Sequence, residues 1–403
     1  MSIFIALLGL GFLIFVHECG HFFASLAVGL RPRRFYVGFP PAIVRRSRNG
    51  IEYGIGTIPI GGFVSIPGMH RPIPHDAERR FSRAVSEAPE LAGPYDRIRR
   101  ALDAGDQEEG IAALDDFDHT LQSVTLSPAE QVSVDKGLTE LRDALGPDAY
   151  WKAATWRRLV AIVAGPAANV LLALVLMTVL FMTSAGKATS KVDSVVSGAP
   201  AAQMGLQSGD RVVAVNGHRV ASPSDIPALI SGSKGHKITL VVERNGEQVT
   251  LGPIAPKQAG DAYRLGFVLG GVGLGPVEAV VHSLDTTKLV TVEIVKSLGR
   301  LAVGEGRKDV ASPIGITQVS SNAIEQGTDS YLWVLALVSL SLALMNLLPL
   351  LPLDGGHVLF ALVEGARGRF VRREIYERVS VVGIVVVLLL FVIGVTNDIN
   401  RLM

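Results

Sequence analysis

The sequence predicts a multi-pass α-helical membrane protein, and three observations lead to that fold class. First, 48% of the 403 residues are hydrophobic and only 19% are charged, while the mean hydropathy of +0.37 is high for a soluble protein of this size. Second, four apolar runs are long enough to cross a bilayer as helices. Third, Lys and Arg cluster beside these runs, as they do at the ends of membrane spans.

Each apolar run reaches the length of about 20 residues that a spanning helix needs. We place four transmembrane helices at 1–30, 157–184, 331–357 and 376–396. The third run ends in "NLLPLLPLDGG", and its prolines predict that the chain unwinds there while it is still at membrane depth. Unwound backbone is tolerated at that depth only where protein or a water-filled cavity surrounds it.

Basic clusters set the expected orientation, because cytoplasmic loops carry an excess of Lys and Arg. The clusters "RPRR" and "RRSR" follow the first span, "WRR" precedes the second, and "ARGRFVRRE" joins the third and fourth. All of them fit the cytoplasm if the N-terminus lies outside. We therefore expect both termini, and the long segment between the second and third spans, to be extracytoplasmic.

Two further regions lie between the first and second spans. Residues 31–70 contain "EYGIGTIPIGGFVSIPGM", which predicts a cytoplasmic-side β hairpin that leads into a glycine-rich, membrane-dipping re-entrant loop; an ordinary surface hairpin is the alternative. Residues 71–150 are acid-rich with helical periodicity, and Ser127 is an expected N-cap. We expect a cytoplasmic helical insert there, a solvated bundle being favoured over a docking site for a cytoplasmic regulator.

Two histidines and a glutamate lie inside the first apolar run, in "IFVHECGHFF". His17 and His21 are four residues apart, so both project from one face of a helix, and Glu18 is one step round from them. This H-E-x-x-H pattern is typical of two zinc ligands and a general base. Ionisable groups at membrane depth are costly, and we therefore favour a zinc site over a buried polar network between helices.

A catalytic zinc usually has three protein ligands and one open position. The single cysteine excludes a multi-cysteine site, so histidine and carboxylate must serve. Asp354 follows the proline-rich turn and is the favoured third ligand, with His357 as the competing residue. Asn346 begins the same motif; its amide could polarise a substrate carbonyl or hydrogen-bond a neighbouring helix. These residues predict metal-assisted hydrolysis of a peptide bond within the membrane, with Glu18 as the base.

The extracytoplasmic segment has short β-branched strands and a hairpin turn at Asn245 and Gly246. Its stretch "GAPAAQMGLQSGDRVVAVNG" resembles a PDZ domain in the circularly permuted arrangement of bacterial proteases, and we place this domain at 188–270. PDZ domains bind extended peptides at a sheet edge. By this resemblance the peptide groove contains Leu265, Gly266 and Phe267. Residues 275–330 then predict an amphipathic helix on the outer membrane surface and a connector.

Taken together, "HECGH", "GTIPIGGFVSIPGM", "AGPAANV", "SPIGITQVSSNAIEQG" and "NLLPLLPLDGGH" resemble the motifs of the site-2 protease family, in its bacterial regulator of sigma-E protease group. The likeness covers nearly the whole chain except the insert from about residue 72 to 147. It implies an intramembrane zinc metalloprotease of the bacterial inner membrane that performs regulated intramembrane proteolysis. It also implies that Zn²⁺ is bound by His17, His21 and Asp354.

The same resemblance implies roles for the neighbouring residues. Glu18 would be the catalytic base, Asn346 would help to bind the substrate, and the loop at Gly61, Gly62 and Phe63 would pair with an unwound substrate as an added strand. Expected substrates are single-span proteins, such as trimmed anti-sigma factors or remnant signal peptides, within the lipid bilayer. The net charge of +1 indicates no nucleic-acid partner. The alternative is a catalytically silent, membrane-anchored PDZ scaffold or metal-binding protein, against which Glu18 argues.

Overall fold

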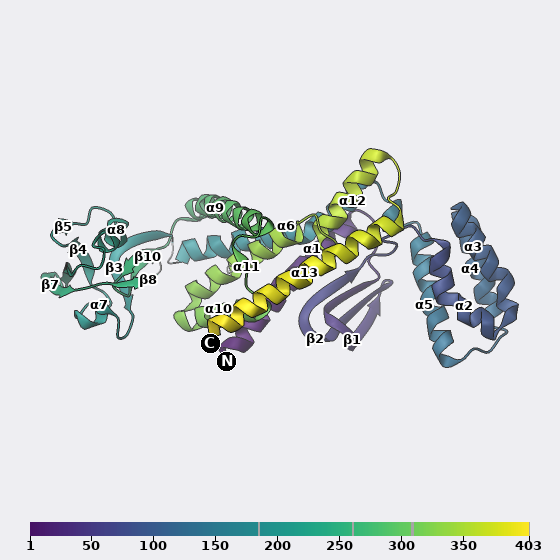
Figure 1. Cartoon of the computed structure of the whole chain (residues 1–403), viewed down its shortest axis with the longest axis horizontal. Helices are drawn as coiled ribbons and strands as arrows, with labels where there is room; N and C mark the ends of the chain where they lie inside the picture. The colour runs from purple at the N-terminus through teal and green to yellow at the C-terminus, as the bar shows by residue number, and fades with distance from the viewer. Residues whose placement is uncertain (184–185, 260–261, 308–309, 403) are drawn as a thin grey trace. The chain divides into compact units, whose positions relative to one another are not determined.

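The computed structural model describes residues 1–183, 186–259, 262–307 and 310–402, and most of them are helical (Figure 1). The chain forms two compact units. The first contains Met1–Leu172, Ile294–Asn322 and Val338–Met403, and the second contains Ala173–Glu293 and Ala323–Leu337. The residues predicted to bind metal belong to the first unit, and the β-rich segment after the second span belongs to the second.

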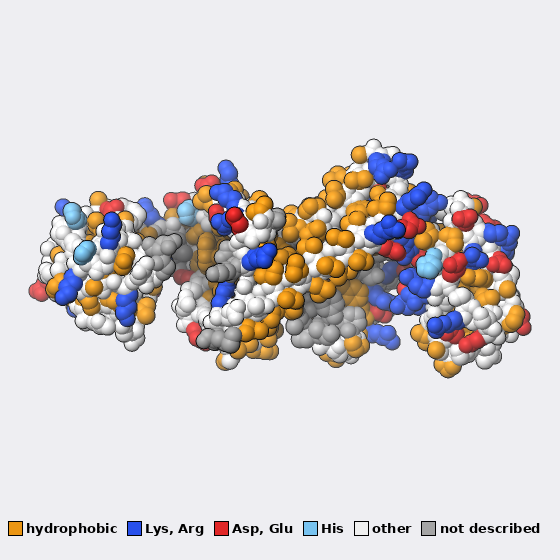
Figure 2. All heavy atoms as spheres, viewed as in Figure 1, with side chains coloured by type: hydrophobic (Ala, Val, Ile, Leu, Met, Phe, Trp, Pro, Cys, Tyr) orange, Lys and Arg blue, Asp and Glu red, His pale blue; other side chains and the backbone are white. Residues whose placement is uncertain are grey.

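Four helices of the described ranges are long and apolar enough to cross a membrane, as predicted. They are α1 (Ser2–Ala27), α6 (Thr155–Thr183), α11 (Thr328–Asn346) and α13 (Arg373–Leu402). Many apolar side chains of these helices are exposed, which would be unfavourable in water. On α13, Val381, Val385 and Leu388 are each more than half exposed. Figure 2 shows the hydrophobic face of this helix. Such helices fit lipid surroundings.

The third span is shorter than predicted, since α11 ends at Asn346 and a separate helix, α12, begins at Asp354 and ends at Arg367. Pro349 and Pro352 lack the N–H groups that would continue the helix through the intervening turn. Gly355 makes this turn tight, because a Cβ there would lie 2.2 Å from the carbonyl oxygen of Leu347. The chain thus re-enters a helix at the residue predicted to bind metal.

The β element consists of strands β1 (Arg34–Arg48) and β2 (Ile51–Ser65). The segment Arg34–Val37 is aligned both with Glu52–Ile55 and with Gly62–Ser65, so it lies between two parts of β2. Gly62–Ser65 is therefore an outer ribbon of the sheet, with one strand partner in the described part of the chain. Gly62 and Phe63 were predicted to lie in a loop, but they lie in a strand. The reason is that β2 turns back and pairs with β1 a second time before the chain leaves the sheet.

The insert has a core of its own, in which the rings of Phe81 and Phe117 stack with centroids 4.7 Å apart. Ser127 stands at the predicted N-cap, but its hydroxyl bonds Glu87 and makes no capping bond. The helices are α2 (Pro74–Glu87), α3 (Ala92–Ala104), α4 (Gln107–Leu121) and α5 (Pro128–Leu145), with short 3₁₀ turns at Pro89–Leu91 and Tyr150–Lys152.

Ion pairs join the insert to the rest of its unit. Arg33, which precedes β1, bonds Asp143 at 2.7 Å and Asp148 at 2.8 Å. Arg373, the first residue of α13, bonds Asp76 of α2 at 2.6 Å. The insert is therefore held at both the β element and the fourth span.

The second unit contains a five-strand antiparallel path in the order β10-β3-β4-β6-β7, so β10 is an edge strand. In this unit the guanidinium of Arg244 donates two hydrogen bonds to the carboxylate of Asp210, each 2.7 Å long. The elements are β3 (Lys187–Val195), α7 (Pro200–Gln203), β4 (Arg211–Val215), β5 (His218–Arg219), α8 (Asp225–Gly232), β6 (Ile238–Arg244), β7 (Glu247–Ile254), β8 (Lys257–Ala259), β9 (Ala262–Arg264) and β10 (Phe267–Val272).

Two helices, α9 (Pro276–Ala302) and α10 (Pro313–Gln326), precede the third span. The N-terminus of α10 is held by a carboxylate from α13: Asp398 accepts hydrogen bonds from the backbone N–H of Ser312 at 2.8 Å and of Gly315 at 3.0 Å. A Cβ at position 315 would lie 2.3 Å from that carboxylate. This contact accounts for the glycine of "SPIGI", because a side chain at position 315 would collide with the carboxylate.

Candidate metal centre

The metal centre begins at the crossing of α1 and α6, where glycine replaces side chains on both helices. A Cβ at Gly20 would lie 2.3 Å from the carbonyl oxygen of Ala164, and a Cβ at Gly165 would lie 2.2 Å from Nε2 of His21. Small residues allow helix backbones to approach closely in a membrane. The close crossing seals His17 and His21 from solvent, with exposed fractions of 6% and 7%.

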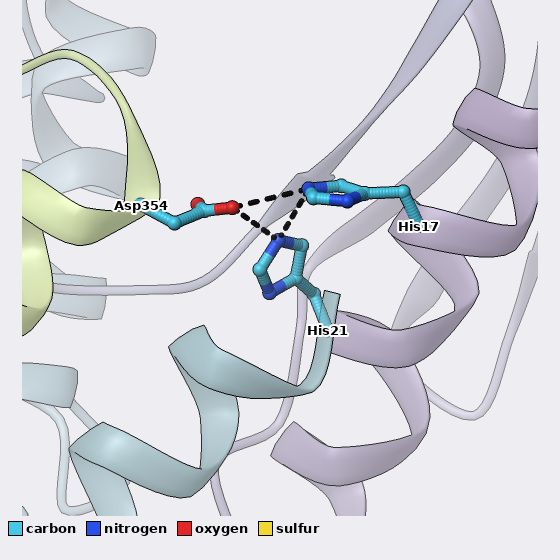
Figure 3. A group of neighbouring side chains, drawn as sticks. All are labelled: His17, His21 and Asp354. Atoms are coloured by element: carbon cyan, nitrogen blue, oxygen red, sulfur yellow. Dashed lines mark hydrogen bonds and ion pairs between the residues drawn. The ribbon is translucent and has the colours of Figure 1, made fainter. Parts of the chain in front are cut away.

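Three donor atoms converge at this crossing (Figure 3). Nε2 of His17 lies 3.1 Å from Oδ2 of Asp354 and 3.1 Å from Nε2 of His21, and the latter lies 3.4 Å from the same carboxylate oxygen. The donor atoms of a tetrahedral zinc site with bonds of about 2.0–2.1 Å are about 3.3 Å apart. The spacing and the two-nitrogen, one-oxygen donor set therefore both fit zinc.

The competing residue, His357, is outside this cluster. It lies one turn along α12 from Asp354 and its Nδ1 hydrogen-bonds the hydroxyl of Tyr376 on α13. It lines the same cavity, of about 630 Å³, as the three donors. The structure thus brings Asp354, and not His357, to the two histidines of α1.

Glu18 and the outer ribbon of the β element also line this cavity. Val64 belongs to this ribbon and lines the cavity together with Glu18. Gly62 lies directly alongside, because a Cβ there would be 3.2 Å from Cγ of Glu18 and 2.7 Å from the carbonyl oxygen of Tyr36. Phe63 lines the cavity and stacks on Tyr36 at 5.1 Å. The surroundings of Gly61, in the same strand, lie outside the described part of the structure.

Asn346, the last residue of α11, reaches the cluster from the other side of the turn. Its Nδ2 lies 3.5 Å from Nε2 of His17. The side chain of Asn346 therefore stands within reach of anything bound between the three donors.

Sequence reasoning missed the residues of α6 that support the two histidines. Nδ1 of His21 donates to the carbonyl oxygen of Ala161 at 2.9 Å, and Nδ1 of His17 lies 3.4 Å from Nδ2 of Asn169. The available signal was "AGPAANV": an asparagine inside an apolar span, four residues after Gly165 and therefore on the same helix face.

The residues predicted to form a peptide groove lie in the second unit. The carbonyl of Leu265 accepts from the Ala201 N–H at 2.8 Å, and that of Gly266 accepts from the Val196 N–H at 2.9 Å. Gly266 has φ +83°, which favours glycine, and Phe267 begins the edge strand β10. The three residues thus form a tight turn into a sheet edge.

The sequence model of peptidase family M50 matches residues 5–390. The chain belongs to peptidase family M50. Zinc metalloprotease RasP of Bacillus licheniformis is 28% identical over 411 residues, which cover 97% of each chain. The protein of the same name from Geobacillus kaustophilus is 28% identical over 410 residues, covering 97% of this chain and 96% of the relative. The Regulator of sigma-W protease RasP of Bacillus subtilis is 26% identical over 423 residues, with the same coverage.

This family member is a membrane zinc metalloprotease, and its cofactor is Zn²⁺. The predicted family, enzyme class and cofactor are confirmed. Against the alternative of a silent scaffold or metal-binding protein, the family and its named relatives favour the enzyme.

Proposed function

We propose that this protease hydrolyses peptide bonds inside the transmembrane segments of single-span proteins, with His17, His21 and Asp354 as zinc ligands and Glu18 as catalytic base. The observation that carries the proposal is that the Asp354 carboxylate meets the two buried histidines of α1, with Glu18 in the same cavity. The helix α1, which holds both histidines and Glu18, is apolar enough to span the membrane. A reaction centre on such a helix is suited to a bond that is itself in the membrane.

The residues of the cavity divide the chemistry among them. Zinc held by the three ligands would polarise the scissile carbonyl and make its water more acidic. Glu18, which lines the same cavity as the three ligands, takes a proton from the attacking water and delivers it to the leaving amine. The amide of Asn346 donates to the substrate carbonyl oxygen as that oxygen gains negative charge.

The substrate must be extended at the scissile bond, because the amides of a helix are shielded by their own hydrogen bonds and by lipid. The outer ribbon of Gly62 to Ser65 supports strand addition, since its edge borders the cavity that contains Glu18. Gly62 keeps that edge open, because a side chain there would press on the base. We therefore assign substrate binding to Gly62 and Phe63, together with Gly61 and Asn346.

The β-rich segment 188–270 is proposed to be the permuted PDZ domain, and its sheet edge at β10 supports a groove formed by Leu265, Gly266 and Phe267. The positive-inside rule favours an inner-membrane topology with this domain and both termini outside, and with the insert 71–150 in the cytoplasm. The insert, which has its own core and is joined by ion pairs to the β element and to α13, is proposed to be a solvated helical bundle, with contact to a cytoplasmic regulator as the alternative.

Anti-sigma factors and remnant signal peptides are the proposed substrate classes. The name of the Bacillus subtilis relative, Regulator of sigma-W protease, supports the first of these. Regulated intramembrane proteolysis is the process that such a substrate implies.

The test is cleavage of a single-span test substrate in liposomes by the wild type, by Glu18→Gln and by the control Glu90→Gln, with zinc content measured on all three. Glu90 is exposed in the insert, so Glu90→Gln repeats the same chemical change away from the cavity. A general base contributes about 10²–10⁴-fold, and Glu18→Gln is expected to lose at least about 100-fold while it retains zinc.

Equal cleavage by wild type and Glu18→Gln would remove Glu18 from the chemistry. Zinc missing from the wild-type protein would remove the proposed ligand set. A similar loss of cleavage in Glu90→Gln would show that the assay responds to folding and not to the base.

A further inference from the structure

Asn169 is a buried polar residue that the proposed chemistry does not use. It lies on α6 with an exposed fraction of 0%, and its backbone carbonyl accepts a hydrogen bond from Ser339 of α11 at 2.8 Å. Its side-chain nitrogen lies 3.4 Å from Nδ1 of His17, and its side-chain oxygen has no partner in the described part of the structure. A buried amide oxygen without a partner costs about 1–3 kcal/mol and calls for a functional explanation.

The two histidines differ in what holds their Nδ1 atoms. His21 faces a backbone carbonyl, which can only accept, so its Nδ1 carries the proton and its Nε2 presents a lone pair. His17 faces an amide, which donates through nitrogen or accepts through oxygen according to its rotation. The orientation of the Asn169 side chain therefore decides whether Nδ1 of His17 faces a donor or an acceptor.

A histidine that binds metal through Nε2 must carry its proton on Nδ1. Rotating the amide of Asn169 by half a turn exchanges its nitrogen and oxygen, and so directs the unpartnered oxygen to Nδ1 of His17. The Nδ1 proton then has an acceptor, and Nε2, the atom that lies 3.1 Å from Asp354, is left unprotonated. The rotation pairs the oxygen with the Nδ1 proton and prepares the ligand, while the amide NH₂ group takes the place that the oxygen held before.

We propose that Asn169 is the positioning residue for His17: its amide oxygen accepts the Nδ1 proton of His17 and thereby presents Nε2 to the metal. This inference rests on the proposed role of His17 as a zinc ligand. Partners of this kind orient the imidazole and make it a stronger base, and their loss typically costs 10–100-fold in metal affinity.

The test measures zinc affinity of the full-length protein in detergent by competition with a chelator. Asn169→Leu removes both donor and acceptor and is expected to weaken zinc binding about 10–100-fold. Asn169→Asp supplies only acceptors and is expected to retain the affinity or raise it. Ser339→Ala is the matched control, because it removes the hydroxyl that bonds the main chain of Asn169 and leaves the amide in place.

An unchanged affinity in Asn169→Leu overturns the inference, as do equal losses in Asn169→Leu and Asn169→Asp. A loss in Ser339→Ala as large as that in Asn169→Leu assigns the effect to helix packing and also overturns it. If Asn169→Leu does not fold by gel filtration, the same comparison is made between Asn169→Ala and Asn169→Asp. His17→Ala separates the two proposals: if it keeps wild-type affinity, the ligand assignment fails, and if it alone loses zinc, only the inference about Asn169 fails.

Discussion

Gly165 provides the sharpest test of the metal centre, because it lies on α6 against a proposed ligand. A Cβ at this position would be 2.2 Å from Nε2 of His21 and 2.5 Å from its Cε1. Since ordinary van der Waals contact begins near 3.4 Å, the imidazole or the helix would have to move by about 1.2 Å. Metal ligands tolerate displacements of only about 0.2 Å. The substitution Gly165→Ala therefore acts on the donor atom itself.

We expect Gly165→Ala to lower cleavage of the test substrate by about 100-fold, the cost of a misplacement of about 1 Å. Zinc affinity, measured by chelator competition, should fall at least about tenfold. Overpacking costs about 1–3 kcal/mol of stability, whereas the higher helix propensity of alanine returns up to about 1 kcal/mol. Thermal unfolding should consequently change little in comparison with the loss of activity.

The matched control is Gly299→Ala on α9, where, apart from the chain neighbours and the nearby backbone of the same helix, no described heavy atom lies within 4 Å of the added Cβ. It makes the same change in a helix and should leave cleavage and zinc affinity at wild-type values. Wild-type zinc affinity in Gly165→Ala would refute the argument that this glycine makes room for His21. Equal losses of cleavage and zinc affinity in both variants would show that replacing any helical glycine has this effect, and that the contact with His21 is not its cause.

Three further predictions follow from the same structure. Asp354→Ala should abolish stoichiometric zinc binding measured by metal analysis, whereas His357→Ala should retain it, because only Asp354 reaches the histidine pair; the reverse result would exchange their roles. Asp398→Ala should lower the thermal stability of the protein by about 1–2 kcal/mol, since two buried N–H groups at the start of α10 lose their acceptor, and an unchanged melting temperature would contradict this. The hydrogen bonds from Arg244 lower the pKa of Asp210 below its ordinary value of 3.8, so the ionised carboxylate stabilises the second unit above about pH 4 and this stabilisation is lost as the pH falls further. The urea midpoints of the wild type and Asp210→Asn should therefore differ near neutral pH and become equal in acid. A difference that stays constant with pH would contradict this.

Local patterns in the sequence were sufficient for the parts of the site that lie within one helix. The i, i+4 spacing of His17 and His21 places both rings on one face whatever surrounds the helix. Four long apolar runs likewise indicate four spanning helices, because the hydrocarbon thickness sets their length. The prolines of "NLLPLLPLDGG" predicted that the chain unwinds there, and α11 ends at Asn346, the first residue of that motif. The bound at residue 357 was too late, since hydropathy continues through the turn.

Contacts between distant segments could not be obtained in this way. Nothing in the sequence near Gly62 indicates that β2 turns back along Arg34 to Val37 and brings an outer ribbon beside Glu18. The carboxylate that holds the start of α10 comes from Asp398, more than 80 residues later in the chain. Such partners depend on which helices and strands pack together.

The sequence by itself determined the identity of the chemistry: the pattern of His17, Glu18 and His21 in an apolar helix predicts a zinc peptidase, because helix periodicity and the cost of burying charge are local properties. The sequence favoured Asp354 over His357, but only the tertiary structure shows that Asp354 meets the two histidines, that Gly165 lies against His21 and that Asn169 lies beside His17. Those three depend on the crossing of α1 with α6 and on the turn before α12. Atoms hundreds of residues apart in the chain meet there at distances that no sequence spacing encodes.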